Sequence, residues 1–221
     1  MPRIPIHRLR KKDMIVLNKF TCKHGHSGLM HYSCWLKEAK AKERVGYFDI
    51  EASNLKANFG IMFGYCIKDR GKKKIYQSTV TKEGLNKHLD RDVIKQCVAD
   101  LKKFDRVVTY YGTGFDLPFV RTRAAYWEIP FPEIDEIRHT DLYYLIRNKF
   151  CLHSNRLENA CKVILGRSAK THLDPNHWIR ALQGNKKSLD YIQDHCVKDV
   201  QDLEKLHNKT FMYRKIADNS I

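Results

Sequence analysis

The segment YFDIEA, residues 47–52, places two carboxylates inside a run of strand-forming residues. Alternate side chains of a strand point to the same face, so Asp49 and Glu51 are expected on one side of a strand that is otherwise apolar. Strand interiors disfavour acids, and two nearby negative charges repel each other and resist burial. The pair therefore favours a bound cation, and hard divalent ions such as Mg²⁺ prefer carboxylate ligands.

The hydrophobic pattern from residue 45 onward predicts an α/β domain, with a mixed sheet flanked by helices. We expect a helix N-cap at Asn155 and another at Asp174, and a cap or turn role for Asp141. The expected strands lie at 46–51, 60–67, 74–80, 106–111 and 137–141, and the expected helices at 91–104, 116–128, 141–149, 155–165, 175–183 and 186–209.

Residues 1–44 differ from the rest because they are basic, carry Cys and His, and show weak periodicity. We expect this segment to be a small extension, residues 45–214 to form the main domain, and residues 215–221 to be a tail. The N-terminal residues are basic without an apolar core, and no window approaches the roughly 18 apolar residues of a membrane span. A reducing, cytoplasmic setting without a membrane partner is the expectation.

The formal net charge is +16, from 41 Lys and Arg against 25 Asp and Glu. Such an excess favours a polyanionic partner, above all a nucleic acid, although lysines spread over a solvated surface are the alternative. The sequence predicts no particular protein partner. Five of the seven cysteines are expected as core or surface thiols: Cys66, Cys97, Cys151, Cys161 and Cys196.

Two further segments place acids where chemistry is plausible. In YYGTGFDLPF, residues 110–119, a strand runs into a glycine-bearing turn and Asp116 begins a helix. In HCVKDV, residues 195–200, His195 and Asp199 are four residues apart and share a helix face. Alone, Asp116 is equally consistent with a helix N-cap and Asp199 with a surface acid. Together, four carboxylates around two ions about 4 Å apart form a site that clamps a phosphodiester.

The segments FDIE, YYGTGFDLPF and HCVKDV resemble the three exonuclease motifs of the DEDD superfamily, which has an RNase H-like fold. The likeness covers about residues 45–210, and the second half is similar to the YprB-like nuclease group. It implies a 3′→5′ exonuclease that acts on a DNA or RNA 3′ end with two Mg²⁺ or Mn²⁺ ions and releases 5′-mononucleotides. A non-catalytic nucleic-acid-binding module and a structure-specific endonuclease are the alternatives.

The resemblance also implies a role for each matching residue. Asp49 bridges both ions, and Glu51 and Asp199 complete the site of the ion that binds the attacking water. Asp116 holds the second ion, at the leaving oxygen. His195 stands where a general base takes a proton from the water.

The spacing of His195 departs from the family pattern. In the family a catalytic Tyr lies four residues before the last Asp and a catalytic His lies five before it, whereas here His195 takes the four-residue spacing and Asp194 the five. We favour His195 over Tyr191, which lies one turn earlier. A His that only orients a water, or a partly exposed His without a chemical part, is the alternative. By family likeness, Asn54 and Leu55 are expected to contact the 3′ end.

The segment CKHGHSGLMHYSC, residues 22–34, carries five closely spaced metal-binding side chains, which belong to Cys22, His24, His26, His31 and Cys34. In a reducing compartment this composition predicts tetrahedral Zn²⁺, for which five candidates compete for four places. One pair of ligands would come from Cys22 with His24 or His26, and the other from His31 and Cys34. The loop between these pairs is shorter than the roughly 12 residues that separate the ligand pairs of a zinc finger. The alternative is a basic His-rich loop that contacts phosphates. Bound zinc would have a structural or docking role, because the segment is too small to bury a core.

Overall fold

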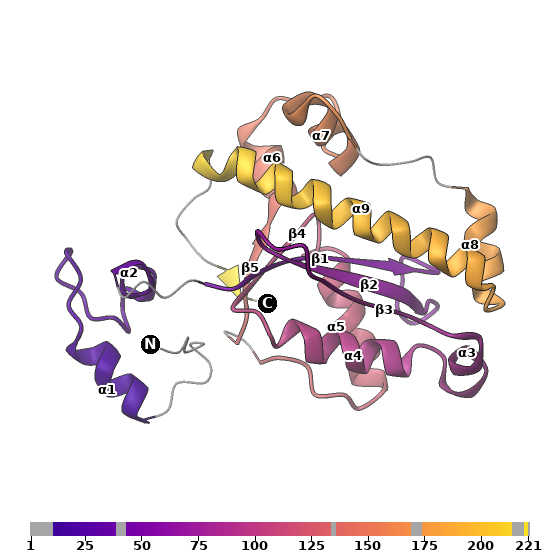
Figure 1. Ribbon diagram of the computed structural model, residues 1–221, viewed down its shortest axis with the longest axis horizontal. Coiled ribbons are helices and arrows are strands. Elements are labelled where there is room, and N and C mark those ends of the chain that lie inside the picture. Colours follow the sequence, from indigo (N-terminus) through magenta and orange to yellow (C-terminus); the bar gives the residue numbers. More distant parts are fainter. Residues whose placement is uncertain (1–10, 39–42, 134–135, 169–173, 214–218, 221) are drawn as a thin grey trace.

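The computed structural model describes residues 11–38, 43–133, 136–168, 174–213 and 219–220. In these residues one sheet carries helices on both faces (Figure 1). The strands are β1 (Val45–Ala52), β2 (Met62–Asp69), β3 (Ile75–Thr79), β4 (Arg106–Thr109), β5 (Arg138–Asp141) and β6 (Asn219–Ser220). The helices are α1 (Lys11–Lys19), α2 (Tyr32–Glu38), α3 (Lys82–His88), α4 (Arg91–Leu101), α5 (Asp116–Tyr126), α6 (Leu142–Lys149), α7 (Leu157–Leu165), α8 (Pro175–Leu182) and α9 (Lys186–Thr210).

The sheet has the strand order β3-β2-β1-β4-β5-β6. Strands β1, β2 and β3 are antiparallel neighbours, β4 and β5 run parallel to β1, and β6 pairs antiparallel with β5. The mixed α/β sheet predicted from the sequence is therefore confirmed. Strand β1 lies in the middle of it and is paired on both sides.

The alternation of β1 divides the hydrophobic core into two layers. Phe48 and Ile50 belong to the layer that α4 and α5 cover. Val45 and Tyr47 belong to the opposite layer, with α6, α7 and most of α9. Because side chains of a strand repeat every two residues, Asp49 follows Val45 and Tyr47 onto the face that α9 covers.

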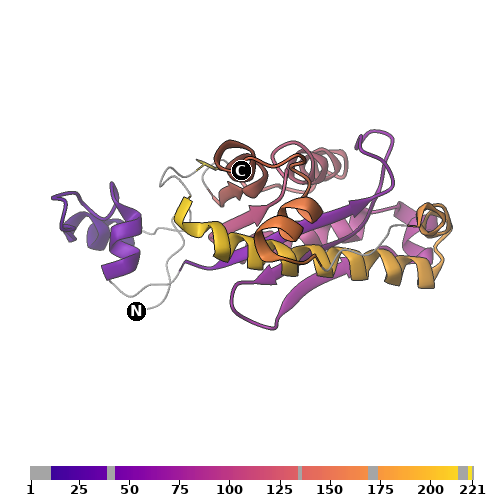
Figure 2. The same cartoon turned by 90° about the horizontal axis from the view of Figure 1, so that it is seen from above.

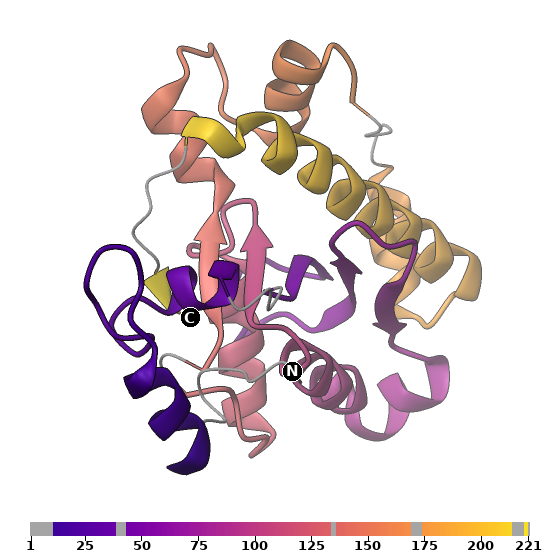
Figure 3. The ribbon, with the colours of Figure 1, turned by 60° about the vertical axis from the view of Figure 1, so that its left-hand side comes forward.

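Helix α9 has 25 residues and runs across the sheet (Figures 1 and 3). The Gln193 side-chain amide donates to the main-chain oxygen of Tyr65 in β2, at 3.0 Å. Gly64 makes this close approach possible, because a Cβ atom there would lie 2.4 Å from Gln193 Oε1. The Cys196 thiol donates to the main-chain oxygen of Asp49 at 3.3 Å, which ties α9 to β1.

A buried ion pair joins β2 to the helices on the other face. Asp90 is fully buried before α4 and accepts hydrogen bonds from the Arg123 guanidinium of α5, at 2.6 and 2.9 Å. Its carboxylate also accepts from the Met62 amide and from Trp127 Nε1, each at 2.9 Å. These donors satisfy the buried charge, so the pair fixes where α5 lies against the sheet.

The structure corrects several local expectations. Helices α1, α2 and α3 were not predicted. Asn155 is not an N-cap, because α7 begins at Leu157 with Arg156 before it, and the main-chain oxygen of Asn155 instead accepts from Tyr110 Oη at 2.6 Å. The cap at Asp174 is confirmed, since its side chain accepts from the Asn176 amide.

Helices α1 and α2 stand beside the layered part of the chain (Figures 1 and 2). The guanidinium of Arg138 lies over the Tyr32 ring, 5.3 Å from its centroid. The division at residues 44 and 45 stays a prediction, and most of the expected tail lies outside the described residues. No helix in the described part of the chain is both long and apolar enough to cross a membrane.

The seven cysteines all lie in described residues, and no disulfide joins them.

We predict that Arg123→Met lowers the free energy of unfolding by about 3–5 kcal/mol, because it leaves the buried Asp90 charge uncompensated. Denaturant unfolding followed by circular dichroism measures this loss. Arg121→Met is the matched control, since Arg121 is exposed on the same helix and should change stability by about 0.5 kcal/mol or less. Equal effects of the two substitutions would contradict a structural role for the ion pair.

Candidate active site

The two acids of β1 lie at the end of the strand where its pairing becomes irregular. Asp49 is opposite Cys66 of β2 and Glu51 is opposite Gly64, and the register shifts between Glu51 and Ala52. Both carboxylates lie on the face that α9 covers, and both residues are partly exposed. The strand therefore presents them together, as the sequence pattern predicted.

Asp116 reaches the same strand from the first turn of α5. Its side chain is buried, and its carboxylate accepts a hydrogen bond from the Ile50 amide at 3.1 Å. The N-cap position is held by Phe115, which makes no side-chain cap, so the simple capping alternative for Asp116 does not apply. The carboxylate is directed at β1, between the positions of Asp49 and Glu51.

The turn before α5 is held by a carboxylate from β5. Asp141 accepts from the Tyr111 amide at 2.8 Å and from the Thr113 amide at 2.9 Å, and it also caps α6 by accepting from Tyr143. Tyr111 has a φ of 68°, a left-handed conformation that is uncommon for a non-glycine residue. Asp141 thus fulfils both the cap and the turn role considered from the sequence, and it positions Asp116.

Asp199 comes from α9, one turn after the contact between Cys196 and β1. Its charge acts on Asp49 and on Asp116. The structure therefore brings together acids from β1, α5 and α9, which are distant in the sequence.

We call Asp49, Glu51, Asp116 and Asp199 the acid cluster. Burial and the closeness of these carboxylates raise the pKa of two of them. Burial is the first cause that raises the pKa of Asp49 well above its ordinary value, and repulsion from the other three carboxylates adds to it. Burial likewise raises the pKa of Asp116 to about 7, although the Ile50 amide acts in the opposite direction. A divalent cation relieves both effects, so the residues present fit a hard cation.

His195 is buried, with 1% of its surface exposed, so the alternative of a partly exposed His is wrong. Its ring packs edge-on against Tyr191, with centroids 5.1 Å apart, and Tyr191 in turn stacks on His177 of α8 at 3.9 Å. Asp194, at the other family spacing, is exposed and forms an ion pair with Lys198 at 2.5 Å. Of the two positions, only that of His195 lies against the core.

The two residues expected at the nucleic-acid 3′ end lie in the loop between β1 and β2. Leu55 is 78% exposed, and Asn54 is exposed, with its side-chain oxygen accepting from the Lys56 amide at 2.9 Å. Phe59 in the same loop is 80% exposed, and no motif or spacing in the sequence singles it out. Two exposed apolar side chains in the loop that follows β1 are a feature that the periodicity of the strands could not reveal.

The Cys and His residues of the N-terminal segment form a second, separate cluster. One ligand atom from each of Cys22, His24, His31 and Cys34 lies within 4.8 Å of the others, whereas His26 is not part of the group. Partial burial lowers the pKa of His31, and the neighbouring His26 and His24 lower it further. The structure thus groups four of the five candidates from the sequence and leaves out His26.

With this geometry in view, comparison with known proteins decides the family. A family profile described as the RNase_H superfamily matches residues 46–211. The chain belongs to the RNase H superfamily. The matched residues include all members of the acid cluster and exclude the Cys and His cluster. No curated relative matches the sequence.

A family B DNA polymerase from the hyperthermophilic archaeon Pyrobaculum calidifontis is one of the similar solved structures. It matches with a TM-score of 0.62 and 20% sequence identity, over 77% of this chain and 25% of that chain. This chain thus spans about a quarter of the polymerase's length. At this identity the likeness shows the fold, which agrees with membership of the RNase H superfamily.

We predict that Asp49→Asn raises the melting temperature when no Mg²⁺ or Mn²⁺ is added, because it removes a poorly solvated charge that three carboxylates repel. An acid whose pKa is raised on folding loses stability as the pH rises above its unfolded value of about 3.9, so the advantage of Asn should grow from pH 5 to pH 8. Each kcal/mol corresponds to about 2–4 °C for a chain of this size.

Thermal scans with and without Mg²⁺ measure the effect. Mg²⁺ should stabilise the wild type and leave Asp49→Asn nearly unchanged, while Asp194→Asn, which alters an exposed acid, should behave like the wild type. A variant that is destabilised equally at every pH would contradict mutual repulsion in the acid cluster.

Proposed function

We propose that this protein is a two-metal-ion-dependent 3′→5′ exonuclease that hydrolyses DNA or RNA and releases 5′-mononucleotides. The observation that carries the proposal is that contacts to Ile50 from α5 and to Asp49 from α9 bring carboxylates of three elements to one end of the central strand. Membership of the RNase H superfamily and the likeness to a DNA polymerase support nuclease chemistry in general. The polarity and the two-ion mechanism rest on the motif resemblance.

The acid cluster would hold two Mg²⁺ or Mn²⁺ ions. By the motif resemblance, Asp49 would be the ligand shared by both ions, and it lies on β1 where contacts from α5 and α9 meet the strand. Glu51 and Asp199 would complete one ion site, and Asp116, fixed by the Ile50 amide, would belong to the other. The bound ions would supply positive charge that attracts the scissile phosphate and promotes attack by water.

His195 is the proposed general base. Imidazole is the side chain that most often takes a proton from water in general base catalysis. The ring packs against Tyr191, and it is next in the chain to Cys196, whose thiol ties α9 to the Asp49 main-chain oxygen of β1. Packing of this kind keeps a catalytic group within reach of its substrate proton.

The nucleic-acid 3′ end would lie against the loop after β1. Leu55 offers an exposed apolar surface that can contact the terminal base, and Asn54 offers an amide next to it. The net charge of +16 favours association with a polyanion, which would weaken as salt rises.

An activity panel tests the proposal as a whole. The substrates are 3′-labelled DNA and RNA strands and a circular single strand, each with Mg²⁺ or Mn²⁺. An exonuclease releases labelled mononucleotides from linear strands and leaves the circle intact. Cleavage of the circle would favour an endonuclease, and binding without any release of nucleotide would favour a non-catalytic module.

We predict that Asp49→Ala abolishes hydrolysis while leaving nucleic-acid binding intact, because it removes the bridging ligand and also lessens repulsion of phosphate. Nucleotide release and fluorescence anisotropy measure the two properties on the same labelled strand. Asp194→Ala should retain both. Hydrolysis by Asp49→Ala at the wild-type rate is incompatible with this site.

We predict that His195→Ala lowers the hydrolysis rate by roughly 10²–10⁴-fold near neutral pH, as expected for loss of a general base. The measurement is the single-turnover rate of the wild type and of the variant near neutral pH, with Mg²⁺ present. Asp194→Ala, which changes the neighbouring exposed residue, serves as the control. A decrease of less than about threefold would assign His195 a structural role only.

A further inference from the structure

The described residues of the segment that carries the Cys and His cluster form a small hydrophobic cluster. Its members are Leu17, Tyr32 and Trp35, against which Phe20 and Leu29 pack. Helices α1 and α2 contribute only nine and seven residues. A segment of this size does not bury enough apolar surface to offset the entropy of ordering its chain, so it needs an additional cross-link.

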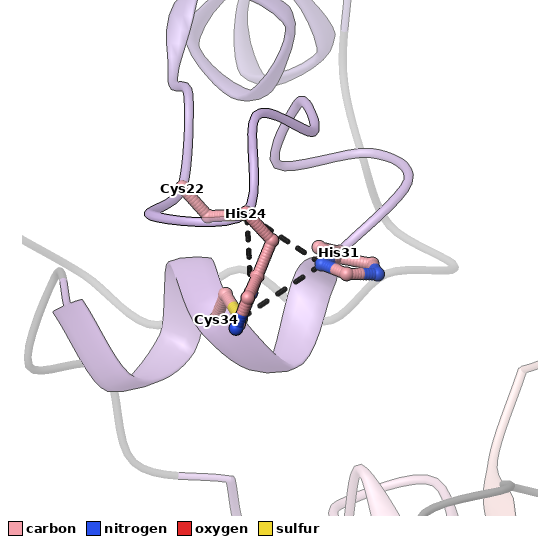
Figure 4. A group of neighbouring side chains, drawn as sticks. All are labelled: Cys22, His24, His31 and Cys34. Carbon is pink, nitrogen blue, oxygen red and sulfur yellow. Dashed lines mark hydrogen bonds between the residues drawn. The ribbon is translucent and has the colours of Figure 1, made fainter.

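The four side chains of the cluster converge from two directions (Figure 4). Cys22 and His24 lie on the loop after α1, whereas His31 directly precedes α2 and Cys34 lies in its first turn. Residues three apart on a helix are neighbours on one face, which lets His31 and Cys34 point together. Each arm thus supplies one thiol and one imidazole.

The distances between the two kinds of atom fit a shared metal ion better than hydrogen bonds. Cys22 Sγ lies 3.8 Å from His24 Nδ1 and 3.5 Å from His31 Nδ1, and Cys34 Sγ lies 3.5 and 4.0 Å from the same two atoms. Zinc bonds of 2.3 Å to sulfur and about 2.05 Å to nitrogen, at a tetrahedral angle, separate S and N by about 3.6 Å. All four pairs lie close to this separation.

The loop of the first arm is a tight knuckle. Gly25 has a φ of 80°, which a residue with a side chain rarely adopts, and its amide donates to the Cys22 oxygen at 2.8 Å. The Cys22 amide donates to the His26 oxygen at 2.9 Å, and Thr21 and Ser27 form a β-bridge across the loop. This turn directs Cys22 and His24 toward α2.

His26 completes the set of five sequence candidates but lies outside the group of four. Its ring lies against that of His31, with centroids 4.1 Å apart, and its buried Nδ1 atom has no hydrogen-bond partner among the residues that the structure describes. The His26 ring therefore packs against His31 and does not join the group formed by Cys22, His24, His31 and Cys34. His26 therefore offers a matched control within the same loop.

Charge also selects the kind of ion. Residues 1–44 carry eleven Lys and Arg against three Asp and Glu, so an uncompensated cation would be repelled there. Two cysteine thiolates cancel the charge of a divalent ion, and sulfur and imidazole ligands suit zinc, whereas the acid cluster offers only hard oxygen ligands. The two clusters are thus suited to different metals.

We propose that Cys22, His24, His31 and Cys34 bind one structural Zn²⁺ ion that folds the segment from Leu17 to Trp35. Four protein ligands close the coordination shell, so the ion has no open position for substrate. Because a ligand set of this kind is assembled only in the folded segment, zinc binding and local folding are coupled. The proposal is independent of the proposed nuclease activity, which depends on other residues.

Metal content and cobalt substitution of the full-length chain test this proposal. We expect one equivalent of zinc per chain after dialysis, and Co²⁺ in its place should give the intense visible bands of tetrahedral coordination with a thiolate-to-cobalt charge-transfer band. Cys34→Ser and His24→Ala should lose the stoichiometric ion, whereas His26→Ala and Cys151→Ser should retain it with an unchanged cobalt spectrum.

Limited proteolysis supplies a readout of folding that does not depend on any variant. Removal of zinc from the wild type should open cleavage sites between Leu17 and Trp35, and restoring zinc should close them, while the RNase H-like part stays resistant. Absence of stoichiometric metal in the wild type, a weak octahedral cobalt spectrum, or loss of metal from His26→Ala but not from His24→Ala would overturn the assignment.

Discussion

Mutual repulsion among four carboxylates is the interaction on which this account depends. Asp49 and Glu51 on β1, Asp116 on α5 and Asp199 on α9 lie close enough for their charges to act on one another, and burial strengthens the effect. Such an arrangement is unfavourable for a fold by itself, because ionised carboxylates resist desolvation. Bound divalent cations would relieve this repulsion, so the electrostatics support the metal dependence of the proposed function.

The rest of the fold holds these acids together by contacts that do not involve their charges. The Asp90–Arg123 pair fixes α5, and the Asp141 carboxylate holds the turn from which α5 starts. On the other face, the approach of Gln193 to the bare backbone at Gly64 seats α9 on the sheet. The acid cluster is thus imposed by packing and hydrogen bonding elsewhere.

The sequence predicted those parts of the structure that depend on local periodicity. Strong alternation around Asp49 and the helical stripe of α9 were sufficient to locate the main elements and the acids they carry. The short helices α1, α2 and α3 were missed because they have few turns over which a period can be recognised. The double role of Asp141 and the exposure of Phe59 depend on tertiary contacts, and the exclusion of His26 depends on the turn at Gly25, so no spacing rule could have supplied them.

Anomalous diffraction from crystals soaked in Mn²⁺ is the most direct test of the central claim. The account predicts two manganese peaks about 4 Å apart, bridged by the Asp49 carboxylate and bordered by the other members of the acid cluster. Crystals in which manganese occupies no site beside Asp49, although the cluster is accessible to solvent, would contradict it.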